Sequence, residues 1–176
     1  MKLYVTRHGE TFRNAENKVL GRDDIMLNEK GKEQADELAE KLQNIPLDII
    51  FTSPLSRAKD TANAVAKKKG LIPVEDKRII EIEFGEFEGV PRDYEPYQAA
   101  KREHFKRYPG GESYFDMAYR IYDFLHMLKK DFSDKNVLVV THGGVCRIIH
   151  NFFVDMENEE FVQFAFPNCG LEQFEL

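Results

Sequence analysis

Two histidine residues, far apart in the chain, each follow a short apolar run and precede a glycine. His8 follows Leu3–Arg7, and His142 follows Val137–Thr141. Each run is typical of a buried β-strand, and the carboxyl ends of such strands face the crevice where open α/β sheets bind ligands. We therefore expect His8, His142 and Arg7 to meet in one pocket. A cationic pocket with a histidine at its centre suits a phosphate group.

A phosphoryl group needs positive charge and hydrogen-bond donors around its oxygens, because charge sits there throughout the reaction. Arginine supplies both, since its planar guanidinium stays charged. Arg57 lies just past a second predicted strand, in the first turn of a helix, and faces the same rim of the sheet as Arg7. His8 can attack phosphorus if its reactive nitrogen is neutral.

A leaving alkoxide needs a general acid, whose carboxyl must be protonated near neutral pH. Burial or nearby negative charge achieves this. The segment Ile79–Gly89 offers four candidates, namely Glu81, Glu83, Glu86 and Glu88. Spacing alone does not choose among them. If the segment is extended, Glu81 and Glu83 share a face, and their mutual repulsion would help to keep one of them protonated.

Strand-like and helix-like segments alternate along the chain. This order predicts an α/β fold with a mainly parallel central sheet covered by helices on both sides, which is a three-layer αβα sandwich. Asn28 is the predicted N-cap of the first long helix, and Gly70 ends the second. The predicted strands are Leu3–Arg7, Leu47–Thr52, Ile72–Val74, Val137–Thr141, Phe161–Phe166 and Leu171–Phe174. The predicted helices are Asn28–Ile45, Leu55–Lys69, Tyr114–Phe132 and Val145–Phe153.

Two segments do not fit this alternation. Asn14–Met26 is polar and irregular, which predicts a loop. Val90–Gly111 carries three prolines, and we interpret it as a small cap-like insertion over the active site of a single domain spanning residues 1–176. Substrate specificity is expected to lie in these two segments. The basic run Lys101–Arg107 within the insertion is more typical of a solvated helix face than of a substrate clamp.

Composition restricts the partners and the compartment. The chain has 176 residues, a formal net charge of −6 and a pI near 5.5. An acidic surface argues against nucleic acid or an anionic membrane as partner, and no apolar run approaches the roughly 18 residues of a membrane span. Because Met1-Lys2-Leu3 enters the first predicted strand directly, we expect no signal peptide. Cys146 and Cys169 are too few for a disulfide framework or a zinc site, so a reduced cytoplasmic compartment is expected, with Cys146 buried on a helix.

Further short motifs accompany the two histidines. They comprise Arg7-His8-Gly9-Glu10-Thr11 with Asn14, then Gly21, Asp24, Leu27, Gly31 and Gln34-Ala35, then Ser53-Pro54-Leu55-Ser56-Arg57-Ala58 with Thr61-Ala62, then Glu81-Ile82-Glu83-Phe84-Gly85 with Glu88-Gly89, then Pro109-Gly110-Gly111-Glu112-Ser113 and Thr141-His142-Gly143-Gly144. Arg-His-Gly alone is a weak signal, but all of these motifs in order are a strong one. The chain resembles the histidine phosphatase superfamily, which includes cofactor-dependent phosphoglycerate mutases and many small-molecule phosphatases.

The resemblance implies a phosphoglycerate mutase-like fold and a role for each motif. It implies that His8 is the nucleophile that becomes phosphohistidine. It implies that Glu81 is the proton donor, and the base that activates water in the second half-reaction. The implied phosphate pocket consists of Arg7, Asn14, Arg57, His142 and Gly143. The resemblance implies no metal ion and no organic cofactor, and the expected partners are a small phosphorylated substrate and inorganic phosphate.

One departure from the mutases bears on the reaction. They usually carry Glu-Arg-His-Tyr-Gly where this chain has Glu81-Ile82-Glu83-Phe84-Gly85, and they are longer. Glu83 thus places a negative charge where the mutases have a base. We therefore expect a metal-independent phosphomonoesterase that releases inorganic phosphate. Phosphoglycerate mutase-type phosphoryl transfer and a non-catalytic phosphate-ligand sensor are the alternatives.

Two other reaction classes fit less well. A metallohydrolase with His8, Glu10 and His142 as ligands lacks helical ligand spacing, and the two arginines would repel a cation. A cysteine phosphatase needs a phosphate-cradling loop between its cysteine and arginine, which the adjacent Cys146 and Arg147 do not leave room for. The leaving group stays open, because members of the resembled family take sugar phosphates, bisphosphates, nucleoside-like phosphates, phosphoserine and α-ribazole phosphate. The short chain with its compact insertion favours a small, accessible monophosphate. The protein is expected to be a monomer or a homodimer.

Overall fold

Five strands form one sheet in the order β3-β2-β4-β1-β5, in a computed structural model that describes residues 1–176. The pairs β1–β4, β4–β2 and β2–β3 are parallel, whereas β5 pairs antiparallel with β1 at one edge. The predicted α/β fold with a mainly parallel sheet is confirmed. The strands are β1 (Lys2–Arg7), β2 (Ile49–Thr52), β3 (Val74–Glu75), β4 (Asn136–Thr141) and β5 (Leu171–Glu175).

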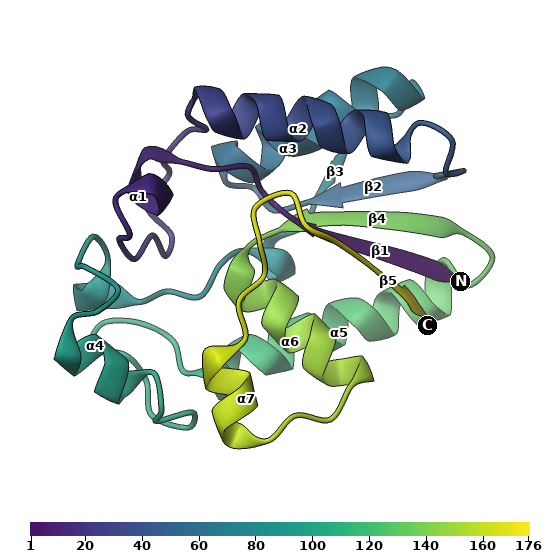
Figure 1. The fold of residues 1–176 in the computed structure, drawn as a ribbon. Helices are drawn as coiled ribbons and strands as arrows, with labels where there is room; N and C mark the ends of the chain where they lie inside the picture. Colours follow the sequence, from purple (N-terminus) through teal and green to yellow (C-terminus); the bar gives the residue numbers. More distant parts are fainter.

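Helices cover both faces of this sheet. The long helices are α2 (Glu29–Leu42), α3 (Ser56–Lys69), α5 (Tyr114–Asp131) and α6 (Gly143–Phe153). α2 and α3 lie on one face, and α5 and α6 lie on the other (Figure 1). In β4, Val137 and Val139 pack into the core on the α5 and α6 side, whereas Leu138 and Val140 pack against α2 and α3. This alternation is what a strand buried on both faces requires.

Local sequence signals fix the ends of the long helices. Asn28 caps α2 by accepting a hydrogen bond from Gly31 N at 2.8 Å. Ser113 and Asp116 form a reciprocal capping box at the start of α5. Gly70 ends α3 with a φ of 64°, in the left-handed region that glycine enters without a steric penalty. The predicted cap of the first long helix and the predicted end of the second are both confirmed.

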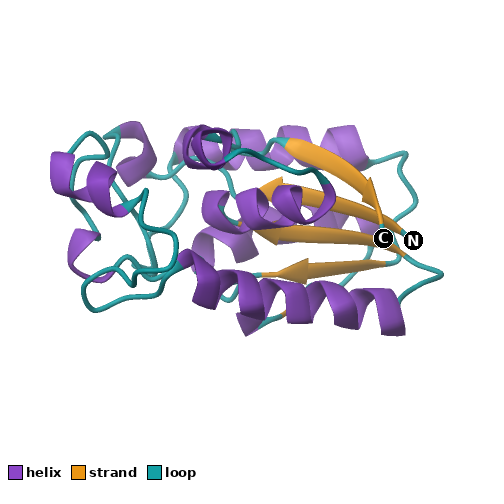
Figure 2. Ribbon diagram, turned by 90° about the horizontal axis from the view of Figure 1, so that it is seen from below, coloured by secondary structure: helices purple, strands orange, loops and turns teal.

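Short helices and loops lie beyond the carboxyl ends of the parallel strands. The short helices are α1 (Phe12–Ala15), α4 (Glu95–Ala100) and α7 (Asn158–Gln163), and 3-10 turns cover Lys77–Ile79 and Gly85–Phe87. α1 and α4 lie with their loops at the left end of the molecule in Figure 2, away from the two termini. This end of the sheet is where open α/β folds bind ligands.

One predicted strand is wrong. Phe161–Phe166 pairs with no strand, because α7 occupies its first half. Glu157 and Glu160 cap this helix reciprocally, and Glu160 Oε2 accepts a hydrogen bond from Glu157 N at 2.9 Å. The neighbouring residues Phe161 and Val162 are both buried. A short apolar run is compatible with either a helix or a strand, and the Glu157–Glu160 capping box stabilises the helix here.

Smaller differences concern the bounds of elements. β3 covers Val74–Glu75 where Ile72–Val74 was expected, and α2 ends at Leu42, before Ile45. Cys146 is buried on α6, as predicted. None of the helices combines the length and the apolar character that crossing a bilayer requires.

Truncating Phe124 should destabilise the fold strongly. Its side chain is fully buried on α5 and meets the ring of Phe51 edge to face at 5.4 Å. We expect Phe124→Ala to lower the free energy of unfolding by about 3–5 kcal/mol. Phe115 on the same helix is 67% exposed, so Phe115→Ala should change the free energy of unfolding by less than about 0.5 kcal/mol. Urea unfolding followed by circular dichroism measures both, and equal losses would contradict the packing described here.

Candidate active site

The pairing of β1 with β4 brings the two histidines together. Arg7 lies opposite Thr141 in the parallel register, and His8 N continues the ladder by donating to Thr141 O at 2.9 Å. His8 and His142 are the next residues on their strands, and their ring centroids lie 5.2 Å apart at an interplanar angle of 61°. Both side chains are buried.

The hydrogen bonds of His8 fix which ring nitrogen can react. His8 Nδ1 lies 2.6 Å from Gly9 O. Because a carbonyl oxygen only accepts, Nδ1 carries the proton and Nε2 keeps its lone pair. Burial, followed by the positive charges of Arg57 and Arg7, holds the pKa of His8 well below its usual range. The imidazole is therefore neutral, as a nucleophile requires.

Arg57 lies against the reactive nitrogen. Its Nε donates to His8 Nε2 at 3.2 Å, and its two terminal nitrogens donate to Gly21 O and Asp23 O, both at 2.7 Å. The guanidinium is fully buried, and burial lowers the pKa of Arg57 to about 10, so it stays charged at neutral pH. The carbonyls of the preceding loop thus hold the cation in place without neutralising it.

Arg7 and His142 each have a buried nitrogen without a hydrogen-bond partner. Arg7 Nη1 donates to Phe166 O at 2.7 Å, but Arg7 Nε has no partner. His142 Nε2 lies 2.6 Å from Ser53 Oγ, while Nδ1 is unpaired. Burial, followed by Arg57 and His8, holds the pKa of His142 well below its usual range. Unpaired buried polar atoms are rare in proteins, so these two nitrogens are candidates for binding ligand oxygens.

A cavity of about 150 Å³ lies in front of His8. Of the residues predicted for the site, Arg7, His8, Asn14, Arg57, Glu81 and Gly143 line it. His142 does not line it, and packs against the His8 ring instead. Asn14 Oδ1 accepts hydrogen bonds from Thr11 N and Oγ1 at 3.2 and 3.1 Å, which leaves the Asn14 amide nitrogen for a ligand. No three side chains of His, Cys, Asp or Glu are grouped as metal ligands.

The structure distinguishes Glu81 from Glu83 as the candidate proton donor, which sequence spacing did not. Glu81 lines the cavity and is 8% exposed, and its carboxylate accepts from Gly144 N at 3.2 Å and Ile82 N at 3.0 Å. Glu83 lies outside the cavity lining, where it forms an ion pair with Arg22 at 3.2 Å. Gly144 allows this approach, since a Cβ there would lie 2.5 Å from Glu81 Oε1.

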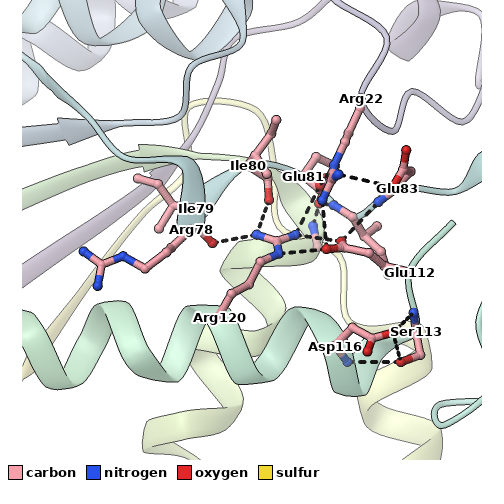
Figure 3. A network of polar contacts seen from close by, with 12 residues as sticks. Arg22, Arg78, Ile79, Ile80, Glu81, Glu83, Glu112, Ser113, Asp116 and Arg120 are labelled. Carbon is pink, nitrogen blue, oxygen red and sulfur yellow. Dashed lines mark hydrogen bonds and ion pairs between the residues drawn. The ribbon is translucent and has the colours of Figure 1, made fainter.

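Two arginines hold the main chain on which Glu81 is carried (Figure 3). Arg120 donates to Arg78 O and Ile80 O, both at 2.6 Å, and to Glu81 O at 3.2 Å. Arg22 donates to the same Glu81 oxygen at 3.1 Å. Each of the two arginines also forms an ion pair with Glu112, at 3.0 Å from Arg120 and 2.8 Å from Arg22.

Sequence reasoning missed both of these arginines. Arg120 had a detectable signal, because it lies three residues after Met117 and four before Phe124, on the apolar face of an amphipathic helix. A charge on that face needs a buried partner. The Glu112 carboxylate and the main-chain carbonyls of residues 78, 80 and 81 are the partners of Arg120. Arg22 lies in an irregular loop and gives no such signal.

The segment after α7 completes the site from the far end of the chain. Phe166 O accepts the hydrogen bond from Arg7, and Asn168 Nδ2 donates to His8 O at 2.8 Å. Cys169 N donates to Arg7 O at 3.0 Å. No motif marks these residues, so they were absent from the predicted site.

This geometry agrees with the comparisons to known proteins. A sequence model described as histidine phosphatase superfamily (branch 1) matches residues 3–176. The chain belongs to the histidine phosphatase superfamily. The family assignment made from the motifs is thereby confirmed.

Relatives of this histidine phosphatase include hydrolases and mutases. Phosphoserine phosphatase 1 of Hydrogenobacter thermophilus is 31% identical, over 97% of this chain and 84% of that protein. The 2,3-bisphosphoglycerate-dependent phosphoglycerate mutase 2 of Gloeobacter violaceus is 33% identical, over 84% and 73%. The structure of phosphoserine phosphatase from Entamoeba histolytica in complex with 3-phosphoglyceric acid superposes with a TM-score of 0.86 and 28% identity, covering 98% and 89%. This histidine phosphatase is an enzyme that hydrolyses phosphate monoesters of small metabolites.

Burial of two neutral imidazoles should make the folded state sensitive to acid. The pKa values of His8 and His142 are lowered by folding from about 6.5 in the unfolded chain. The unfolded state therefore binds more protons below about pH 6.5, and stability falls as the pH decreases. Each group contributes up to about 1.4 kcal/mol per pH unit in that range.

Replacing His142 with glutamine removes one of these titrations. We expect the free energy of unfolding of His142→Gln to fall less steeply with decreasing pH than that of the wild type, between about pH 6.5 and 5. The difference between the two slopes should correspond to about one bound proton. Urea unfolding in buffers without phosphate or sulfate measures the two slopes. Identical slopes would show that His142 is not held neutral by the fold.

Proposed function

We propose that this phosphatase transfers the phosphoryl group of its substrate to His8 Nε2 and then hydrolyses the phosphohistidine, without a metal ion. The observation that carries the proposal is the hydrogen bond from His8 Nδ1 to Gly9 O. It leaves the lone pair of a neutral imidazole on Nε2, in a cavity that Arg7 and Arg57 also line. A nucleophile and the charges that bind its target thus lie together.

Donors from four parts of the chain would bind the phosphate. Arg7 Nε and His142 Nδ1 are both buried and unpaired, and of the two residues Arg7 lies in the cavity lining while His142 packs against the His8 ring. Gly143 is the first residue of α6, so its N–H has no partner inside the helix, and a helix N-terminus favours an anion. The Asn14 amide and Arg57 Nε complete the set. A phosphate oxygen that accepts from Arg57 Nε would release the lone pair of His8 for attack.

The proton movements follow from the same contacts. As the bond from Nε2 to phosphorus forms, the bond from phosphorus to the leaving oxygen breaks, and the Glu81 carboxyl donates its proton to that oxygen. The Gly9 carbonyl stabilises the positive ring through Nδ1–H. The Glu81 carboxylate then takes a proton from water, whose oxygen attacks phosphorus. The bond to Nε2 breaks, and inorganic phosphate leaves with His8 neutral again.

Two broader expectations remain proposals. Both cysteines are free, which fits a reducing compartment, and we place the enzyme in the cytoplasm. The enzyme acts as a monomer or a homodimer, and none of the groups named above requires a second copy.

Removing the nucleophile tests the mechanism directly. We expect His8→Ala to lower kcat for phosphate release by at least about 10⁴-fold, measured on a panel of phosphomonoesters in a strong chelator. His126→Ala changes an exposed histidine on α5 and serves as the matched control, with wild-type activity expected. Quenching the wild type during turnover in an alkaline denaturant should trap a phosphoenzyme that is stable to base and labile to acid, and that His8→Ala lacks.

The same panel separates hydrolysis from the alternatives. Full turnover by His8→Ala would overturn the mechanism, and activity lost in chelator would overturn metal independence. Isomer interconversion that needs a bisphosphate primer and outpaces phosphate release would establish a mutase. Binding of phosphate esters without any turnover would establish a sensor.

Replacing each acid with its amide tests the assignment of the proton donor. Glu81→Gln should lower kcat by about 10²- to 10⁴-fold for substrates with a poor leaving group. Its effect should be smaller for 4-nitrophenyl phosphate, because nitrophenolate leaves without a proton. Glu83→Gln removes an ion pair outside the cavity and should leave kcat within a few-fold of the wild type. The reverse pattern would assign the role to Glu83.

A further inference from the structure

One acid of the segment Ile79–Gly89 lies behind the cavity and binds main chain only. Glu88 is outside the cavity lining. Its carboxylate accepts from three N–H groups, those of Arg22 at 2.9 Å and of Asp23 and Phe84, both at 3.2 Å. An ionised carboxylate only accepts hydrogen bonds, so it suits a place where N–H groups converge. Glu88 thus joins two loops that are far apart in the sequence.

The N–H of Arg22 belongs to the peptide group that holds Arg57. Gly21 O and Arg22 N are the two polar atoms of one planar peptide group. Arg57 Nη2 donates to that oxygen at 2.7 Å, and that N–H donates to Glu88 Oε1 at 2.9 Å. Gly21 has a φ of 58°, and a Cβ there would collide with Glu88 Oε1, so glycine is required for this approach. Turning the peptide plane away from Glu88 would also turn its carbonyl away from Arg57.

The N–H of Phe84 belongs to a second peptide group, which is held in the same way. Its carbonyl oxygen, Glu83 O, accepts from the N–H of Glu112 at 2.9 Å, while Phe84 N donates to Glu88 Oε1. This peptide group lies just after Glu81 in the chain. Without the carboxylate it would keep a partner on one side only, and the main chain next to the proton donor would be free to turn.

The two loops meet at a single oxygen atom of Glu88. Oε1 accepts from both Arg22 N and Phe84 N. The main chain beside it makes a further connection, because Gly89 N donates to Val19 O at 2.8 Å. Burial raises the pKa of Glu88, so a carboxylate at this position is costly, and the converging N–H donors offset that cost.

We propose that Glu88 is a positioning residue for two groups of the site at once. Its carboxylate holds the peptide group that places Arg57 against His8, and it also holds the main chain that carries Glu81. The proposal rests on the function proposed above, which assigns phosphate binding to Arg57 and proton transfer to Glu81. Glu88 acts only through these two residues.

Two variants of Glu88 separate its hydrogen bonds from its bulk. Glu88→Met keeps the length of the side chain but leaves three N–H groups without an acceptor. Glu88→Gln keeps one carbonyl oxygen, which can still accept from Arg22 N and Phe84 N, but its amide nitrogen cannot accept from Asp23 N. Glu86→Met changes an exposed acid of the same segment and is the matched control. Circular dichroism at the assay temperature checks that each variant is folded.

Inhibition by inorganic phosphate measures the effect on Arg57. We expect Glu88→Met to raise the inhibition constant for phosphate by at least about fivefold, because a displaced guanidinium binds phosphate oxygens less well. Glu88→Gln should retain about a twofold effect. Glu86→Met should match the wild type. Competition with 4-nitrophenyl phosphate gives all four constants.

The dependence on the leaving group measures the effect on Glu81. We expect Glu88→Met to lower kcat for an alkyl phosphate at least about tenfold more than kcat for 4-nitrophenyl phosphate, whose nitrophenolate leaves without a proton. In a Glu81→Gln background this difference should vanish, because the group through which Glu88 acts is already removed. The raised inhibition constant should persist there, since Arg57 is unchanged. A merely structural role would lower kcat for both substrates alike in either background.

The outcomes separate this inference from the proposed function. A wild type that releases no phosphate, or a Glu81→Gln variant without any dependence on the leaving group, would refute the proposed function. A wild type that behaves as proposed, with Glu88→Met equal to Glu86→Met in both measurements, would refute only the role of Glu88. Equal losses for both substrates in both backgrounds would refute it too. If Glu88→Met does not fold, Glu88→Gln decides, and wild-type values in both measurements would refute the role.

Discussion

The parallel pairing of β1 with β4 is the constraint on which the rest of the site depends. It sets Arg7 opposite Thr141, and the next residue of each strand is a histidine. A slip by one residue would turn every side chain of the strand to the other face, and the cores on both sides would lose their fit. The burial of Val137 through Val140 therefore helps to fix the position of the two imidazoles. The other residues of the site come from α1, α3, α6 and the loop that carries Glu81.

Main-chain carbonyls, rather than acids, hold most of the arginines in this cavity. Arg7 is held by Phe166 O, Arg57 by Gly21 O and Asp23 O, and Arg147 by Phe164 O. A carbonyl accepts a hydrogen bond and fixes the geometry but does not cancel the charge. An ion pair would fix the side chain equally well and weaken its attraction for a phosphate. Glu112, by contrast, pairs with Arg22 and Arg120, which support the main chain outside the cavity.

Regular elements and the residues at their ends were predictable from the sequence, whereas residues that act across loops were not. The apolar runs before His8 and His142 gave the strands, their parallel order and the meeting of the two rings. The same kind of pattern failed at Phe161–Phe166, where a side-chain cap overrides an ambiguous run. Spacing could not rank Glu81 above Glu83, because the turn that directs one inward depends on hydrogen bonds from Arg22 and Arg120. Asn168 carries no local signal, since its role arises from a hydrogen bond to His8 O, which is distant in sequence.

The contacts of the segment Phe166–Cys169 have a consequence for synthesis on the ribosome. Chains emerge from the amino terminus, so Arg7 and His8 are exposed long before the residues that complete them. Until Phe166 and Asn168 are released from the exit tunnel, Arg7 lacks its carbonyl partner and the His8 main chain lacks its amide donor. The side chain of Arg7 and the main chain of His8 are therefore held in place only after the chain has left the tunnel as far as Asn168. A nascent chain released only as far as Thr141 contains β1 to β4 but has neither β5 nor a completed phosphate site.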